Sequence, residues 1–374
     1  MMQIPDHVVS RTVNLAFNAA QALSVPRFRW IRSIGGKRGS LSDAPPGFQT
    51  ESAAFAPFFS TESLARLLRV TVSVPLPGRE ASGPIPYAGE YAGAHPRERW
   101  LFINGICTDR RMALINAEML SRMFGRPFTI LYNTTGGFLW DLAESAVGKS
   151  WDGITEAVVA NLPEFTSALE DPEVDRVVLV AHSQGTILAA VLLKLLEEIL
   201  HAAPDLRTGA GTGPVSPERR VARRIAGTGP AGAAEQPRDA EPHVRRARQC
   251  LTTRDVGKLE VYCFANCATS MEPFVAIGSP PRHAPWIESY GNEYDLVAKL
   301  GLLAPPHGIG SARIAGDRYR RLGAWGHLLN AHYLAPILAD LAEPRVGLEP
   351  FHDNLRRTPR LLEYLNGGRP GAHP

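Results

Sequence analysis

Residues 175–200 read DRVVLVAHSQGTILAAVLLKLLEEIL and carry the strongest indication of the fold class. The first part of this stretch, residues 175–181, is a nearly uninterrupted apolar run, which is typical of a strand buried on both faces of a parallel sheet. Residues 185–201 then carry the apolar pattern of a long helix. Only three residues separate the two patterns, so the chain must turn sharply from strand to helix.

The alternation of strand and helix patterns continues on both sides of this stretch. Buried strands are expected at residues 100–104 (WLFIN), 127–132, 259–265 and 285–290, and helices at residues 110–124 and 155–169. Pro163 should kink or divide the second of these helices, because a proline lacks the backbone N–H that a helix interior uses. Four or five strand–helix units in succession predict an α/β fold with a doubly wound, mostly parallel sheet.

Composition divides the chain into five segments. Residues 61–202 and 258–366 carry the two parts of the sheet domain. Between them, residues 203–257 have almost no large apolar side chains and are rich in Gly, Pro, Ala and Arg, so we expect a disordered or loosely ordered insertion. Residues 367–374 should form a frayed tail. Residues 1–60 are expected to form an N-terminal arm with an amphipathic helix, whose apolar residues recur at helical spacing at Val9, Val13, Phe17 and Ala20.

The composition also excludes several classes of protein. Of the 374 residues, 44% are hydrophobic and 21% are charged, which is ample apolar material for a globular core. The 40 Lys and Arg residues and the 37 Asp and Glu residues leave a net charge of +3, too small for a dedicated nucleic-acid-binding protein. Four cysteines are too few for a disulfide framework, and we expect Cys263 and Cys267 to be buried thiols rather than metal ligands.

No apolar run approaches the roughly 20 residues that cross a bilayer, so we expect no transmembrane helix. The apolar run at residues 13–25 is interrupted by polar side chains and lacks a clean small-residue cleavage site, so it does not resemble a signal peptide. We therefore predict a cytoplasmic protein. Residues 27–32 (RFRWIR) mix cations with aromatics, which suits peripheral contact with a membrane surface, although a solvated arm is the favoured interpretation.

The residues that could carry chemistry begin with Ser183, which lies between the central strand and its helix. A serine on a tight strand-to-helix turn projects its hydroxyl from the sheet, and the strained turn accommodates only small residues two positions away on either side. Ala181 and Gly185 meet this requirement. The turn also directs the backbone N–H of Gln184 toward the space beside the serine oxygen, at the positive end of the following helix.

The strand, the turn Ala181-His182-Ser183-Gln184-Gly185 and the helix resemble the nucleophile elbow of the α/β-hydrolase superfamily, in particular its lipase and esterase branch. The resemblance extends from about Trp100 to Pro336, with Ala181 in place of the usual first glycine. It implies an α/β-hydrolase fold and a catalytic triad in the chain order serine, acid, histidine, and it requires no cofactor. In such a triad the imidazole takes the serine proton, and the carboxylate orients the imidazole and stabilises its charged form.

Candidates for the acid and the base follow Ser183 in that order. Asp295 lies in the stretch YGNEYDLV (residues 290–297), where its D-x-V pattern resembles the acid loop of the family, with Glu293 and Glu288 as alternatives. His327 ends the Gly-rich stretch GAWGH and is the expected base, with His332 as the alternative. The H-x4-H spacing of the two histidines does not match the H-E-x-x-H zinc motif, so the sequence indicates no metal site.

The resemblance also implies an oxyanion hole, which needs two hydrogen-bond donors. The loop Asn104-Gly105-Ile106-Cys107 follows the strand WLFIN and occupies the place of the H-G-x loop of the family, with Asn104 where histidine is common. The backbone N–H of Ile106 would then be the second donor beside that of Gln184. A plain strand-to-helix connection is the alternative interpretation of this loop.

The resulting expectation is a serine hydrolase that cleaves a small-molecule or lipid-like carboxylic ester through an acyl-enzyme intermediate. The same triad would also serve a thioesterase, a lactonase or an acyltransferase, because it does not choose the leaving group or the acceptor. The departures at Ala181 and Asn104 leave a third alternative, a catalytically silent hydrolase fold that acts as a binding or scaffolding protein.

Overall fold

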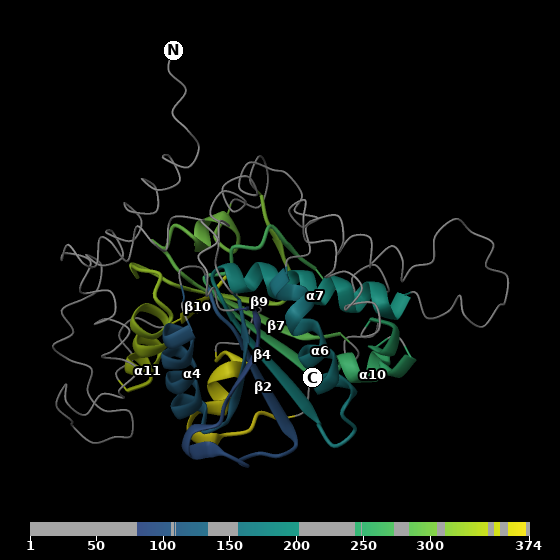
Figure 1. Cartoon of the computed structure of the whole chain (residues 1–374). Coiled ribbons are helices and arrows are strands. Elements are labelled where there is room, and N and C mark those ends of the chain that lie inside the picture. The colour runs from purple at the N-terminus through teal and green to yellow at the C-terminus, as the bar shows by residue number, and fades with distance from the viewer. Residues whose placement is uncertain are drawn as a thin grey trace.

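The structure is a computed structural model that describes residues 81–105, 108, 110–133, 156–201, 244–247, 249–272, 284–304, 311–342, 348–351 and 358–371. Within these residues the chain has a mixed α/β fold, with one mostly parallel eight-stranded sheet and helices on both of its faces. Figure 1 shows α6 and α7 on one side of the sheet and α4 and α11 on the other.

The eight strands lie in the order β1-β3-β2-β4-β5-β7-β9-β10. The two outer strands, β1 and β10, pair antiparallel with their neighbours, and all other pairings in this sheet are parallel. A separate short parallel pair is formed by β6 (Ser270–Met271) and β8 (Arg313–Ile314). The strands of the large sheet are β1 Gly83–Tyr87, β2 Glu98–Ile103, β3 Phe128–Tyr132, β4 Arg176–His182, β5 Leu259–Phe264, β7 Trp286–Asn292, β9 Asp317–Arg321 and β10 Leu348–Pro350.

The helices divide between the two faces of the sheet. One hydrophobic core contains the buried side chains of α6, α7 and α10, and the other contains those of α4, η7, α11 and η8. The α-helices are α4 Arg110–Phe124, α6 Glu156–Glu170, α7 Gln184–His201, α10 Thr253–Val256 and α11 Ala335–Ala342. The 3-10 helices are η3 Gly89–Tyr91, η6 Ala298–Leu300 and η8 Arg360–Gly367, and η7, Leu329–Leu334, is a π-helix.

The apolar run of the central strand explains these two cores. Along β4, Val177, Leu179 and Ala181 face one core, while Val178 and Val180 face the other, as the two-residue period of a strand requires. All five side chains are fully buried. Complete burial stabilises an aliphatic side chain of this size by roughly 1.5–3 kcal/mol. A strand with this composition is therefore stable only in the interior of a sheet that is covered on both faces.

The alternating strands and helices predicted from the sequence are confirmed, and α4 has the expected bounds. Pro163, however, does not divide α6, which continues from residue 156 to residue 170. Leu162, Phe165 and Leu169 are buried on this helix. Their burial offsets the roughly 3 kcal/mol that a proline costs inside a helix.

Two predicted irregular segments are partly ordered. Residues 244–247 and 249–250 of the expected insertion are helical, α10 follows, and Val244, Ala247, Leu251 and Val256 are buried in one of the cores. Arginines lie between these apolar positions, so the average composition of the segment is polar and the prediction missed its helices. The predicted frayed tail is ordered as far as Gly371, because buried side chains bind its carbonyl groups. The predicted amphipathic helix and the RFRWIR stretch lie outside the described residues.

Three buried carboxylates lie near the amino ends of the parallel strands, and two of them, Glu98 and Glu260, bind the arginines that hold this tail. Each accepts a hydrogen bond from an aromatic side chain two residues further along its own strand: Glu98 from Trp100, Glu260 from Tyr262 and Glu288 from Tyr290. Arginine side chains bind two of these carboxylates and the carbonyl groups of the tail. Arg126 bonds Glu98 and the carbonyl groups of Phe124, Tyr364 and Gly368, Arg360 bonds Glu260 and the carbonyl group of Gly371, and Arg369 bonds Glu98.

None of the described helices combines the length and the apolar composition that a membrane-spanning helix needs.

Candidate active site

Ser183 lies at the carboxyl end of β4, directly before α7 begins. Its backbone has a φ of 57°, in the left-handed region that residues other than glycine rarely adopt. The Ser183 N–H donates to the carbonyl oxygen of Phe264 at 2.9 Å, and the Thr186 N–H donates to the carbonyl oxygen of Ser183 at 2.9 Å. These bonds hold a conformation that costs of order 1–3 kcal/mol, so the turn is fixed by its surroundings.

Small residues surround the turn because backbone from β2 passes against it. A Cβ atom built on Gly185 would lie 2.6 Å from the carbonyl oxygen of Ile103 and 2.9 Å from that of Asn104. A Cβ atom on Gly105 would lie 2.8 Å from the Cβ of Ser183. Ala181 is fully buried and pairs with Ile103 on one side and Cys263 on the other. The small residues that the sequence predicted for the turn are therefore required by close backbone packing.

Three of the residues expected from the sequence come together at one edge of the sheet. The Nε2 atom of His327 lies 2.7 Å from the Oγ of Ser183, and its Nδ1 atom lies 2.8 Å from the Oδ2 of Asp295. Ser183 follows β4, Asp295 follows β7 and His327 follows β9, and these parallel strands end at the same edge. All three residues are buried. With Nδ1–H donating to the carboxylate, Nε2 is free to accept the serine proton.

Asp295 accepts hydrogen bonds from three donors. Its Oδ2 accepts from His327 and from the hydroxyl of Tyr333 at 2.7 Å, and its Oδ1 accepts from the backbone N–H of Val297 at 2.8 Å. Burial raises the pKa of Asp295, but the charge and hydrogen bond of His327, together with the other two bonds, outweigh burial and leave the pKa below its ordinary value. Asp295 is therefore an ionised carboxylate at neutral pH.

The loop that carries His327 is held by neighbouring side chains. Nε2 of His182 lies 2.7 Å from the carbonyl oxygen of His327, and the two imidazole rings lie 4.8 Å apart. Burial, followed by the nearby His327, lowers the pKa of His182 to about 3, so His182 is neutral and donates this bond from Nε2–H. The side-chain amide of Asn292 donates to the carbonyl group of Gly326 at 3.1 Å. Gly326 has a φ of 89°, and a Cβ there would overlap the ring of His332.

The alternative acids and the alternative base have other partners. Nδ1 of His332 accepts the backbone N–H of Leu328 at 2.9 Å. Glu293 accepts the backbone N–H of Gly323 at 2.6 Å, and Glu288 belongs to the carboxylate network near the amino ends of the strands, where burial raises its pKa. The side chain that contacts the Ser183 hydroxyl is thus that of His327, and the carboxylate that contacts the His327 ring is that of Asp295.

The region expected to bind the oxyanion is only partly described. Gln184 is the first residue of α7, so its backbone N–H is among the amides at the helix start that have no acceptor within the helix. Ile106, the second expected donor, lies outside the described residues. Asn104 and Asn133 exchange hydrogen bonds of 2.9 Å between side chain and backbone, and Asn133 Nδ2 donates to Gln184 Oε1 at 3.0 Å. These three buried amides hold the ends of β2 and β3 against the start of α7.

Sequence reasoning missed two of these contributors. Tyr333 lies in an apolar pattern that indicates only a core position, so nothing local reveals its bond to Asp295. Asn133 directly follows the strand predicted at residues 127–132, and a polar residue at that sheet edge is a signal that could have identified it. His182 directly precedes Ser183, and its bond to the His327 carbonyl group links the turn to the histidine loop.

Cys263 and Cys267 are buried free thiols, as expected. Burial raises the pKa of Cys267 to about 12, and its thiol donates to the carbonyl oxygen of Ser183 at 3.3 Å. Among the residues that the structure describes, no group of three or more His, Cys, Asp or Glu side chains could hold a metal ion.

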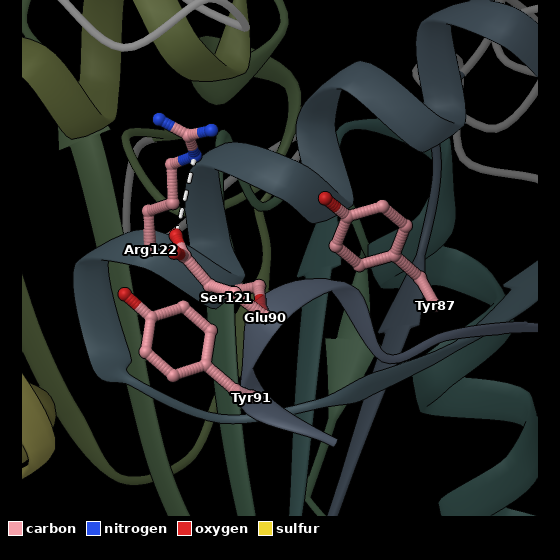
Figure 2. A pocket seen from close by; sticks show the side chains of 5 residues that line it. All are labelled: Tyr87, Glu90, Tyr91, Ser121 and Arg122. Atoms are coloured by element: carbon pink, nitrogen blue, oxygen red, sulfur yellow. Dashed lines mark ion pairs between the residues drawn. The ribbon is translucent and has the colours of Figure 1, made fainter.

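The large hydrophobic side chains exposed in the described part of the chain gather beside the acid and the histidine. They are Tyr294, Leu296 and Trp325, of which Leu296 and Trp325 are exposed by 62% and 64%. The rings of Tyr294 and Trp325 lie 5.2 Å apart. A separate hollow, shown in Figure 2, lies between β1, η3 and α4 and is lined by Tyr87, Glu90, Tyr91, Ser121 and Arg122. This hollow contains none of the candidate residues.

Neither the known protein families nor the curated proteins include a match to this sequence. Functional interpretation therefore depends on the geometry of the site.

Proposed function

We propose that this protein is a serine hydrolase of the α/β-hydrolase superfamily that cleaves carboxylic esters through an acyl-enzyme intermediate. The observation that carries the proposal is the continuous contact from Ser183 Oγ to His327 Nε2 at 2.7 Å and from His327 Nδ1 to Asp295 Oδ2 at 2.8 Å. This contact begins at a serine held in a left-handed turn. The combination is the geometry that nucleophilic catalysis by serine requires.

Two features of the fold support the superfamily assignment. The serine follows a central strand of a mostly parallel sheet, and the acid and histidine follow later strands in the chain order serine, acid, histidine. The close packing at Gly185 and Gly105 brings Gly105 next to Ser183, and an oxyanion hole in this superfamily forms on that side of the serine.

The proposed reaction begins when Ser183 Oγ attacks the ester carbonyl carbon and His327 Nε2 takes the hydroxyl proton. Asp295 stabilises the imidazolium that forms, because its carboxylate accepts the Nδ1–H. The backbone N–H of Gln184 stabilises the negative oxygen of the tetrahedral intermediate, and we assign the second donor to Ile106. His327 then protonates the departing alcohol, and a water molecule activated by His327 releases the acid from Ser183.

The surface beside the triad supports an ester with an apolar portion. Tyr294 and Leu296 flank Asp295 in the chain, and Trp325 lies two residues before His327, so all three exposed hydrophobic side chains belong to the loops that carry the acid and the base. Apolar contacts of this kind bind hydrocarbon without selecting the leaving group. Comparison of ester, thioester and lactone substrates separates an esterase from a thioesterase or a lactonase.

The test is hydrolysis of p-nitrophenyl butyrate by the wild-type protein and by Ser183→Ala. We expect measurable turnover by the wild type and a loss of at least about 10³-fold in the variant, because the nucleophile is absent. Ser270→Ala removes an exposed hydroxyl on β6 and is the matched control, with an activity equal to that of the wild type. Turnover by Ser183→Ala at the wild-type rate would refute the proposal.

A further inference from the structure

The hydroxyl of Tyr333 occupies a distinctive place beside the candidate triad. Its Oη accepts the backbone N–H of Asn292 at 3.2 Å and donates to Asp295 Oδ2 at 2.7 Å. The same Oδ2 accepts the Nδ1–H of His327 at 2.8 Å. Two donors thus share one carboxylate oxygen, and one of them is the imidazole that contacts Ser183.

We propose that Tyr333 is a positioning residue that limits how strongly Asp295 supports the His327 imidazolium, by sharing the carboxylate oxygen to which His327 donates. This inference rests on the proposed hydrolase function. Tyr333 does not contact the reacting atoms, and it acts through Asp295.

The physical argument concerns the charge on one oxygen atom. A hydrogen bond to a carboxylate stabilises its negative charge and makes the oxygen a weaker base toward any other donor. The Asn292 N–H polarises the Tyr333 hydroxyl and strengthens its donation to Asp295. Burial and the adjacent Asp295 charge raise the pKa of Tyr333 well above its ordinary value, so its proton is retained throughout the working pH range.

Removal of the hydroxyl should therefore strengthen the remaining bond from His327 to Asp295. A more basic carboxylate stabilises the imidazolium further, so the pKa of His327 should rise in Tyr333→Phe. The unprotonated imidazole is the general base, and the acidic limb of kcat/KM reports its ionisation in the free enzyme. That limb should move to higher pH.

Other titratable groups face this site from neighbouring elements. His182 on β4 contributes a ring 4.8 Å from that of His327, and its pKa of about 3 keeps it neutral across the assay range. Cys267, after β5, has its pKa raised by burial to about 12, so it also keeps its proton. His332 on η7 accepts the Leu328 N–H at Nδ1, a bond that requires the unprotonated nitrogen.

The experiment compares the pH dependence of kcat/KM for p-nitrophenyl butyrate in the wild type and in Tyr333→Phe. We expect the acidic limb to shift upward by about 0.5–1 pH unit. At a pH below both midpoints this corresponds to a fall of about 3–10-fold in kcat/KM. A purely structural loss would lower activity at every pH without moving the limb. Tyr319→Phe removes another buried hydroxyl, which donates to Asp317 rather than to Asp295, and this matched control should leave the profile unchanged.

A second readout does not depend on turnover. The ionisation of His327 can be followed by NMR in protein labelled with ¹⁵N-histidine, with the resonance assigned by its loss in His327→Gln. An inactive wild type would refute the proposed hydrolase, and the NMR titration would still decide the role of Tyr333. An unchanged His327 midpoint in folded Tyr333→Phe would overturn the inference.

If Tyr333→Phe does not fold, 3-fluorotyrosine at position 333 replaces it. The fluorine makes the phenol a stronger donor, so the pKa of His327 should fall rather than rise. A midpoint that stays the same or rises in this protein would contradict the inference.

Discussion

Asp295→Asn removes the negative charge from the candidate triad while preserving the size of the side chain. In the structure, Oδ2 accepts from His327 and Tyr333, and Oδ1 accepts from the Val297 N–H. An asparagine has one oxygen and one NH2 group, so at least one of these donors must face another donor. Either orientation weakens the arrangement around His327.

The two orientations have different consequences for the histidine. If the NH2 group faces His327, the ring must accept at Nδ1 and carry its proton on Nε2, where it cannot take the proton of Ser183. If the oxygen faces His327, the correct tautomer is kept but no charge stabilises the imidazolium. We expect kcat/KM to fall by about 10³–10⁴-fold, which corresponds to roughly 4–5.5 kcal/mol in the activation barrier.

The assay is hydrolysis of p-nitrophenyl butyrate, with thermal unfolding to show that the variant is folded. The folded-state pKa of Asp295 is depressed, so its contribution to stability is present above the unfolded pKa and is lost as pH falls through the folded pKa. The variant should therefore be less stable than the wild type at neutral pH, with a difference that disappears in acid. Glu293→Gln alters the alternative acid and should keep activity within about threefold of the wild type. If Asp295→Asn keeps activity within about tenfold of the wild type, or if Glu293→Gln loses more activity than Asp295→Asn, then Asp295 is not the acid that supports His327.

Two further predictions concern the surface beside the site and the tail. Trp325→Ala should lower kcat/KM for a long-chain ester by about 5–10-fold and leave the acetate ester within about twofold, because the exposed indole offers apolar surface to a long acyl chain and little to an acetyl group. Equal losses for both esters would contradict this prediction. Arg126→Ala should lower the free energy of unfolding by about 3–5 kcal/mol, because Arg126 and Glu98 form a fully buried ion pair of 2.7 Å. Urea denaturation measures this loss, and a change below about 1 kcal/mol would argue against a structural role for the pair.

The centre of the sheet could be predicted from the sequence because its signals are local. The apolar run before Ser183, the small residues at Ala181 and Gly185 and the long helix after them lie within one short stretch. The strand–helix units on either side have the same strong periodicity. Close packing of β2 against the turn then explains why those small residues were informative.

The edges of the sheet could not be predicted, because they depend on long-range pairing. In β1, Pro84 and Pro86 remove backbone donors, which a strand tolerates only at the edge of a sheet. β9 reads DRYRR and is polar by composition, yet it lies between β7 and β10. The tail after Gly367 contains little apolar material. Arg126 and Arg360 order it by binding its backbone carbonyl groups, and Glu98 binds the side chain of Arg369. Neither a backbone contact nor a partner distant in sequence leaves a local signal.

The site shows the same division. Ser183 and His327 lie in local patterns that indicate their roles, a strand-to-helix turn and a Gly-rich loop. The sequence favoured Asp295 over Glu293 because of the short D-x-V pattern, and in the structure the carboxylate of Asp295 contacts His327. Tyr333 shares the carboxylate only because η7 folds back over the loop after β7, and such an approach has no signature in the sequence around Tyr333.

Labelling by a fluorophosphonate measures whether Ser183 is an activated nucleophile, since the reagent reacts with serine only when a neighbouring base takes its proton. We expect one equivalent of label, located by peptide mass spectrometry on Ser183 and absent from Ser183→Ala. If the folded wild-type protein takes up no label, or if Ser183→Ala takes up as much label as the wild type, Ser183 is not an activated nucleophile, and a binding or scaffolding role for the fold is favoured.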